Sequence, residues 1–391
     1  MQTLAAALLP AGLMDVLPRA AAFEAQTVER LMRHFASFGY ERVKPPLMEF
    51  EETMLAGSAA PLGAETFRLM DPISQRMLAL RPDMTMQVAR IACSRLAHQP
   101  RPLRLGYAGQ VVRVRGTQLR PERQFGEVGA EIVGTDAPAA DVEVIAMATS
   151  ALAALGVAGL TVDLSLPTLV PAILAELPID LSTGDRLRLA LDRKDIAAIT
   201  TLAPVLGDAN AAMLARLVAS TGPAETALTV LNSLELPPAA AAERARLKSV
   251  YEQLHRESPT LTLTIDAVEN RGFEYHTGVT FALFAAAAPD EIGRGGRYRT
   301  QTGEASTGVT LFIDAVLRAL PRPAAEPRLL VPAETLPEIV QRLRREGWIA
   351  VGALMTSIDP IAEATRLGCT HVLIDGKPQP LHSPARQSGE G

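Results

Sequence analysis

The chain has 391 residues, of which 48% are hydrophobic and 21% are charged, and its formal net charge is −5 at pH 7. This length allows more than one domain, and this composition is that of a globular protein able to bury large cores. An acidic chain with 4% aromatic residues is a poor candidate for a protein dominated by binding to nucleic acid or to anionic membranes.

The cysteines and the N-terminal residues indicate in which cellular compartment the protein is expected. Cys93 and Cys369 lie far apart and belong to no Cys/His cluster, so we expect neither a disulfide nor a metal site. The first ten residues are apolar but have no basic segment typical of a signal peptide, and we expect no later run of transmembrane length. We therefore expect a cytoplasmic protein without a membrane segment and without a cofactor.

The first predicted element is an amphipathic helix over residues 20–38, followed by Gly39 as a helix-ending residue. Its apolar residues recur at the helical spacing i, i+3, i+4 and i+7, as they do at Val28, Leu31, Met32 and Phe35. The next segment, residues 40–50, contains Pro45 and Pro46. Prolines cannot donate to a sheet, so this segment is predicted to be an edge or interface strand.

Residues 67–131 alternate strand and turn signals. A hairpin is predicted around Asp71-Pro72. Two longer strands, residues 104–114 and 123–132, flank a polar loop and are predicted to pair antiparallel. An alanine-rich helix over 139–155 and a strand over 160–166 follow.

Residues 167–258 are predicted to form a helical insertion, and strand signals return from 261 to 314. The proline-rich stretch 321–327 is predicted to be a linker that closes a first domain at residue 320. Residues 328–381 follow a β-α-β-α-β pattern typical of a small parallel sheet. The tail, residues 382–391, is polar and is predicted to be disordered.

The segment 271–278, Arg-Gly-Phe-Glu-Tyr-His-Thr-Gly, is typical of a binding site for a small zwitterion. The guanidinium of Arg271 suits a planar carboxylate, because its donor fork matches two oxygens, and Tyr275 and His276 are placed to line a pocket. Two structural alternatives stay open. Arg271 could pair with Glu274 or a sheet carboxylate, and His276 could be a pocket wall or a satisfied core residue.

Four further residues add acidic and hydroxyl groups. Asp83 and Thr85 could hold an ammonium group on a turn, or could form a turn aspartate with its hydroxyl partner. Glu131 lies in an apolar strand and needs a partner, either a ligand or an arginine. It is four residues from Glu127, so both carboxylates are predicted to lie on one face of the strand.

The remaining basic and glycine-rich segments have open roles. Arg113 is predicted to be either an ion-pair partner or an anion site. The pair Gly295-Gly296 is weak evidence for phosphate binding and is more typical of a turn. A solvated loop face is the simplest interpretation of three arginines, namely Arg115, Arg120 and Arg123.

In order and content, these segments resemble the catalytic domain of class II histidyl-tRNA synthetases from about residue 17 to residue 320. The helix and the Pro45-Pro46 strand resemble the dimer-forming first motif, and Arg113 matches the arginine of the second. Residues 271–275 match the R-G-x-[DE]-Y signature of the histidine branch. The resemblance implies an α+β fold, with a class II synthetase-like antiparallel sheet, flanking helices, a helical insertion and a small C-terminal α/β domain.

The resemblance also implies a histidine pocket. Asp83, Thr85 and Glu127 would hold the α-ammonium group, Glu131 would face the imidazole, and Arg271 would take the carboxylate. The complete implied set is Asp83, Thr85, Arg113, Glu127, Glu131, Arg271, Tyr275, His276 and Tyr298.

Two of the departures from the synthetase pattern lie in the ATP-binding motifs. Arg115 stands where the family has a glutamate that reads adenine, and Ala315 stands where it has an arginine that grips the ATP γ-phosphate. With the shortened C-terminal domain, these departures make the chain similar to the regulatory subunits of two-component ATP phosphoribosyltransferases.

That similarity implies a non-catalytic subunit required for the first step of histidine biosynthesis and for its feedback regulation. The implied partners are a short-form ATP phosphoribosyltransferase catalytic subunit, a second copy of the chain and L-histidine as effector, with no membrane and no tRNA. The alternatives are an aminoacylating histidyl-tRNA synthetase-like enzyme and an RNA-sensing pseudo-synthetase.

Overall fold

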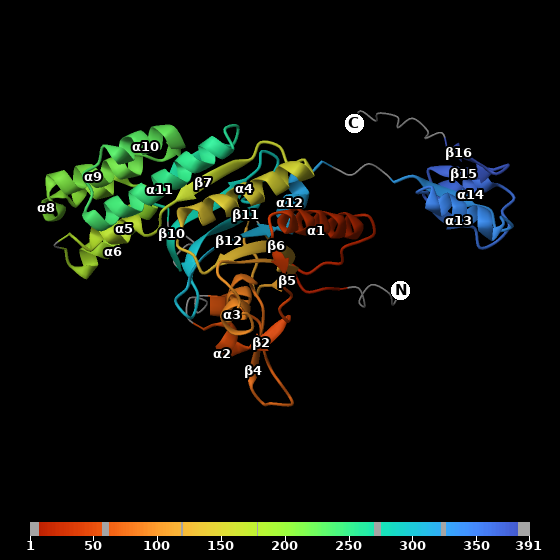
Figure 1. Cartoon of the computed structure of the whole chain (residues 1–391), viewed down its shortest axis with the longest axis horizontal. Coiled ribbons are helices and arrows are strands. Elements are labelled where there is room, and N and C mark those ends of the chain that lie inside the picture. Colours follow the sequence, from red (N-terminus) through yellow and green to blue (C-terminus); the bar gives the residue numbers. More distant parts are fainter. Residues whose placement is uncertain are drawn as a thin grey trace. The chain divides into compact units, whose positions relative to one another are not determined.

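A computed structural model describes residues 8–56, 62–118, 120–177, 179–269, 275–321 and 326–381 (Figure 1). The chain divides into two compact units, the first ending at Pro321 and the second beginning at Arg322. Parts of three predictions lie outside the described residues. These are the ligand role of Arg271, the linker at residues 322–325 and the disordered tail at residues 382–391.

A nine-stranded sheet forms the centre of the first unit, in the order β1-β5-β6-β12-β11-β10-β7-β9-β8. Its neighbouring strands are antiparallel except for the pairs β1–β5 and β7–β9, which are parallel. The predicted pairing of the two long strands around the polar loop is confirmed as β5 with β6. The strands are β1 (Glu41–Arg42), β5 (Leu103–Val112), β6 (Gln124–Val133), β7 (Thr161–Ser165), β8 (Gly222–Pro223), β9 (Thr262–Asp266), β10 (His276–Phe284), β11 (Gly293–Arg299) and β12 (Ala305–Phe312).

A second, three-stranded sheet contains the predicted hairpin. Its order is β2-β4-β3, with β2 at Met48–Phe50, β3 at Arg68–Met70 and β4 at Met77–Leu80, all antiparallel. The prediction of one strand across residues 40–50 is wrong in one respect. The prolines divide this segment into β1 and β2, and the two strands join different sheets.

Within the described ranges and outside the helical insertion, four helices pack against the central sheet, and α2 (Glu51–Met54) packs on the smaller sheet (Figure 1). The predicted amphipathic helix is confirmed as α1, which buries Leu31, Met32 and Phe35, and Gly39 follows it with a positive φ of 86°. The four helices are α1 (Ala20–Ser37), α3 (Thr85–Ser94), α4 (Pro138–Leu155) and α12 (Ile313–Ala319).

Helix α4 corrects the expectation that no run approaches transmembrane length. It is the one helix within the described ranges that is long and apolar enough to cross a membrane by length and composition, and 61% of it is buried. It packs against α1, α11 and β12, so its apolar character is explained by a central place in the core.

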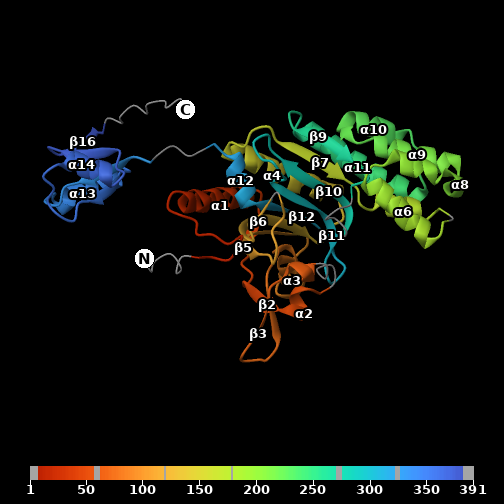
Figure 2. The same ribbon diagram turned by 180° about the vertical axis from the view of Figure 1, so that it is seen from behind.

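The predicted helical insertion is confirmed at the β9–β8 end of the sheet, where Figure 2 shows its helices gathered (green). The only strand residues described within it are the two of β8. Its helices are α5 (Leu169–Leu174), α6 (Leu181–Asp192), α7 (Ile196–Thr201), α8 (Ala203–Leu206), α9 (Asp208–Ala219), α10 (Ala224–Asn232) and α11 (Pro238–Glu257).

The second unit is a small sheet with a helix on each face. Helix α13 (Pro337–Arg345) contributes Leu343 to one apolar cluster, and α14 (Pro360–Arg366) contributes Ala364 to another. Three parallel strands were predicted and are present, namely β13 (Arg328–Val331), β14 (Ile349–Gly352) and β15 (His371–Ile374). The fourth, β16 (Lys377–Pro380), pairs antiparallel with β15 and was not predicted, because its two prolines are unusual in a strand.

Arg297 on β11 ties the sheet to the N-terminus of α4. Its side chain is 1% exposed, and its Nη2 donates to Asp141 Oδ2 at 2.8 Å and to the Ala137 carbonyl at 2.9 Å. Its Nη1 donates to the Thr135 carbonyl at 3.0 Å. A buried arginine whose donors are satisfied in this way fixes where the helix begins on the sheet.

We expect Arg297→Ala to lower the free energy of unfolding by about 3–5 kcal/mol, because it leaves the Asp141 carboxylate buried without its cation. Urea unfolding followed by circular dichroism measures this change. The matched control is Arg299→Ala on the same strand, where the side chain is exposed and donates only to the Gly303 carbonyl. Equal losses in the two variants would contradict the anchoring role.

Candidate functional site

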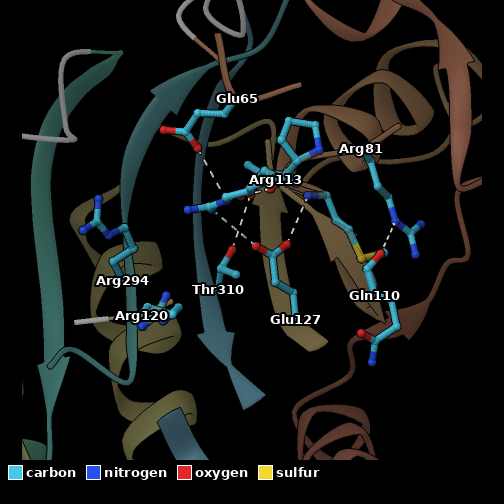
Figure 3. Close-up of polar contacts among 12 residues, drawn as sticks. Glu65, Arg81, Gln110, Arg113, Arg120, Glu127, Arg294 and Thr310 are labelled. Atoms are coloured by element: carbon cyan, nitrogen blue, oxygen red, sulfur yellow. Dashed lines mark hydrogen bonds and ion pairs between the residues drawn. The ribbon is translucent and has the colours of Figure 1, made fainter. Parts of the chain in front are cut away.

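A cavity of about 1000 Å³ opens on the central sheet, at the upper end of the usual range for small-molecule pockets. It is lined by residues of β10, β11 and β12, by the turn before α3 and by the loop after β5. We call Asp83 and Glu131, together with Glu127 buried beside the cavity, the acid end. We call Arg113, Arg120 and Arg294 the arginine end. Figure 3 shows Arg113 between Glu127 and Glu65, with Arg120 and Arg294 farther along.

Strand alternation places the two glutamates, as predicted. Glu127 and Glu131 lie on one face of β6, whereas Val128, Ala130 and Ile132 alternate with them and join the hydrophobic core. Both glutamates are 1% exposed. The prediction that they share a face is therefore confirmed, and both are more deeply buried than strand position alone requires.

Two glycines make room for Glu131 and for Tyr107, which lies across from it. Gly308 on β12 pairs with Glu131, and a Cβ atom there would lie 1.9 Å from Glu131 Oε2. Gly129 pairs with Tyr107 on β5, and a Cβ atom there would lie 2.2 Å from the phenol ring. The acid end therefore depends on glycine at two cross-strand positions.

Glu131 is surrounded by hydroxyl groups. Tyr298 donates to its Oε2 at 3.0 Å, and Tyr107 donates to its Oε1 at 3.4 Å. The Thr310 and Thr85 hydroxyls lie 2.8 Å and 3.2 Å from that of Tyr107. Sequence reasoning missed Tyr107 and Thr310. The pattern Gly-Tyr-Ala-Gly in a strand was the available signal, but it becomes informative only when the register with Gly129 is known.

Burial raises the pKa of Glu131 well above its usual range, and the nearby charge of Asp83 acts in the same direction. Burial and the charge of Asp83 likewise raise the pKa of Glu127. Glu127 accepts from the Met84 backbone N–H at 3.3 Å, and its Oε1 lies 3.9 Å from the guanidinium of Arg113. Two buried carboxyl groups on one face of β6 thus have raised pKa values.

Asp83 and Thr85 form a turn, which was one of the two roles predicted for them. Asp83 Oδ1 accepts from the backbone N–H of Thr85 at 2.7 Å, directly before α3 begins. Both residues also line the cavity. The turn therefore presents them to the pocket, and their contact with a ligand remains a prediction.

Tyr275 and His276 lie at the start of β10 and line the cavity with their rings 3.9 Å apart between centroids. Tyr275 meets Tyr298 edge-on at 6.3 Å. His276 is 7% exposed, which agrees with the predicted role of a pocket wall. The structure thus brings together eight of the nine residues of the implied pocket, and Arg271 lies outside the described residues.

Of the two roles predicted for Arg113, the structure has the ion pair. Its guanidinium lies 3.6 Å from Glu65 and 3.9 Å from Glu127, and its Nε donates to the Pro82 carbonyl at 3.2 Å (Figure 3). This cation is therefore shared between two carboxylates.

The expectation that Arg120 lies on a solvated loop face is wrong. Its side chain is 8% exposed and its guanidinium lies 4.0 Å from the ring centroid of Phe312. It pairs with Asp314 at 3.4 Å and Asp290 at 3.9 Å. Burial lowers the pKa of Arg120, and these carboxylates oppose the shift. The long side chain turns inward because it contacts the Phe312 ring and pairs with Asp314 and Asp290 there.

The other two arginines of that loop differ from each other. Arg115 is exposed, as expected. Arg123 is half-buried and donates to the carbonyls of Arg113 and Ala11.

The expectation of a turn at Gly295-Gly296 is also wrong, because both residues lie inside β11. A Cβ atom at Gly295 would lie 2.1 Å from the Gly308 carbonyl oxygen. These glycines therefore allow close approach of β11 to its neighbours at the cavity.

Comparison with known proteins gives a consistent set of relatives. The family model for histidyl-tRNA synthetase matches residues 12–316. The ATP phosphoribosyltransferase regulatory subunit of Paramagnetospirillum magneticum is 56% identical over 367 residues, covering 94% of this chain and 96% of that protein.

Two solved structures are similar. One, from Bacillus halodurans, is described as an ATP phosphoribosyltransferase regulatory subunit/histidyl-tRNA synthetase, with a TM-score of 0.80, 25% identity, and coverage of 92% of this chain and 96% of that one. The other is a chain of the ATP phosphoribosyl transferase (HisG:HisZ) complex from Thermotoga maritima. It has a TM-score of 0.59, 18% identity, and coverage of 74% of this chain and 97% of that one, which shows a shared fold.

We expect Glu131→Gln to gain stability relative to the wild type as the pH rises. The raised pKa means that the folded protein keeps a proton that the unfolded chain releases above about pH 4.3, so this group destabilises the folded state increasingly at higher pH. A neutral amide removes that effect. Urea unfolding at about pH 5 and about pH 8 measures it, with the exposed Glu29→Gln as control. If the difference in the free energy of unfolding between Glu131→Gln and the wild type is the same at both pH values, the raised pKa of Glu131 is contradicted.

Proposed function

This chain belongs to the family of ATP phosphoribosyltransferase regulatory subunits, and we propose that it is a non-catalytic, cytoplasmic subunit of such an enzyme. In this role it binds L-histidine and is required for the activity of a short-form catalytic subunit. The observation that carries the proposal is the contrast between the two ends of the cavity.

The acid end supports the binding of an amino acid. Asp83 and Glu131 line the cavity and Glu127 is buried beside them, so that an ammonium group and a basic ring find acidic partners there. In the proposed pose Asp83, Thr85 and Glu127 hold the ammonium group, Glu131 faces the imidazole, and Arg271 takes the carboxylate. Tyr275, His276 and Tyr298 form the walls, and Arg113 neutralises Glu127.

The arginine end supports the absence of adenylation. Transfer chemistry on a triphosphate depends on cations directed at its oxygens. Here Arg113 is shared between Glu65 and Glu127, and Arg120 is held by Asp314 and Asp290. Arg294 pairs with Glu291. Ala315, at the position of the synthetase arginine, is 1% exposed and follows directly on Asp314.

Feedback requires that histidine bind the inhibited arrangement of the complex more tightly than the active one, since a ligand shifts an equilibrium only through differential affinity. We also propose that the chain forms a self-dimer through the region around β1 and β2. Leu47 and Met48 are 45% and 42% exposed there, beside the prolines of the resembling dimer motif.

The first functional prediction concerns catalysis. Adding this chain to its short-form catalytic subunit is expected to raise the rate of phosphoribosyl transfer to ATP, whereas the chain alone is expected to give no histidine-dependent ATP–pyrophosphate exchange. Copurification from the native source tests the partnership independently. Robust exchange by the chain alone would replace the regulatory proposal with that of a histidyl-tRNA synthetase.

The second concerns the ligand. Arg271→Ala is expected to weaken histidine binding to the complex by roughly 10- to 100-fold, because a charge-assisted hydrogen bond to the ligand carboxylate contributes about 1.5–3 kcal/mol. Isothermal titration calorimetry measures this, with the exposed Arg256→Ala on α11 as the matched control. Equal affinities in wild type and Arg271→Ala would remove Arg271 from the site.

A further inference from the structure

Glu131 differs from Glu127 in the kind of partner it has. Glu127 has a backbone N–H donor and the Arg113 guanidinium within reach. Glu131 is equally buried, yet its hydrogen bonds come from the hydroxyls of Tyr298 and Tyr107. Across the residues that the structure describes, no lysine or arginine forms an ion pair with Glu131.

The elements packed around Glu131 supply little positive charge. Tyr107 faces it from β5, Tyr298 from β11 and Thr310 from β12, and Asp83 with Thr85 approach from the turn before α3. Its own strand adds Glu127, and the start of β10 adds Tyr275 and His276 at the same cavity. An ionised carboxylate buried without a cation is expensive, and two neighbouring acids increase the cost. Without a ligand, these surroundings therefore favour the neutral, protonated form of Glu131.

The same surroundings can also support the anion. Burial raises the pKa of Tyr107 and Tyr298 well above its usual value, so both phenols keep their protons and remain donors. Their oxygens lie within hydrogen-bond distance of the two carboxyl oxygens, and that of Tyr107 is also 2.8 Å from the Thr310 hydroxyl. Once a cation enters beside it, Glu131 can lose its proton and accept hydrogen bonds from these hydroxyls.

We propose that Glu131 passes its proton to the ring of the bound histidine, so that the ligand is held as an imidazolium ion. This inference rests on the proposed histidine site. One O–H bond of Glu131 breaks, one N–H bond forms at the unprotonated ring nitrogen, and no other reactant takes part. The product is a buried ion pair whose anion accepts from Tyr107 and Tyr298, and the charges of Asp83 and Glu127 favour its cation.

The proton transfer has a consequence for selectivity. A ring or amide of similar size that is not basic cannot take the proton, and leaves Glu131 as a neutral acid without its ion pair. The site thereby distinguishes histidine from other planar side chains by basicity rather than by shape alone.

The direct test is nitrogen NMR on full-length protein saturated with L-histidine labelled with ¹⁵N at both ring positions. At about pH 8 the ring of the free ligand is neutral, because its pKa is about 6.5. Neutral imidazole gives two widely separated nitrogen shifts and imidazolium gives two similar ones. We expect imidazolium in the wild type and in the Glu29→Gln control, and a neutral ring in Glu131→Gln.

A neutral ring in the wild type would overturn the inference and leave the proposed function standing, since histidine is then still bound. Absence of histidine binding to the chain and to its complex would overturn both. Infrared difference spectra of the wild type serve if Glu131→Gln fails to fold or bind. Ligand addition is expected to remove a protonated carboxyl band and to produce a carboxylate band. If the protonated carboxyl band does not disappear when histidine is added, the inference is wrong.

Discussion

The burial of two carboxyl groups on the central strand β6 is the constraint on which the site depends. Ionised carboxylates are costly inside a sheet, and the structure offsets that cost locally. Gly308 and Gly129 leave the space, and the hydroxyls of Tyr298 and Tyr107 donate hydrogen bonds to Glu131. Either glycine exchanged for a larger residue would displace an oxygen-bearing side chain that the acid end needs.

At the arginine end of the same cavity the charged side chains are cations, and their charge has to be balanced. Its cations are matched by acids of this chain, with Arg120 held between Asp314, Asp290 and the Phe312 ring. A polyanion entering here would have to displace those acids and meet their repulsion, which removes most of the favourable charge interaction. The two ends therefore differ in the kind of ligand they can accept, although both are lined by charged residues.

Sequence patterns predicted the parts of this site that depend on local periodicity. Alternation along β6 placed Glu127 and Glu131 on one face, and helical spacing predicted α1. The errors arose where a side chain's environment comes from distant segments. Arg120 looked solvated because Phe312 and Asp314 lie almost 200 residues away, and Gly295-Gly296 looked like a turn because the need for close strand approach depends on β12. The roles of Tyr107 and Thr310 likewise depend on cross-strand register, which one sequence does not reveal.

A sensor and an enzyme use binding energy differently. An enzyme directs it to groups that interact more strongly in the transition state, and those groups must be free to meet developing charge. In this cavity the arginines suited to that task are paired with acids of the chain, whereas the contacts proposed for histidine at the acid end are made with the ligand in its ground state. Energy gained there is available to favour one arrangement of a complex over another, and its size limits how far histidine can shift that equilibrium. An acid end that takes a basic ring as a cation increases this energy without requiring any group directed at a phosphate.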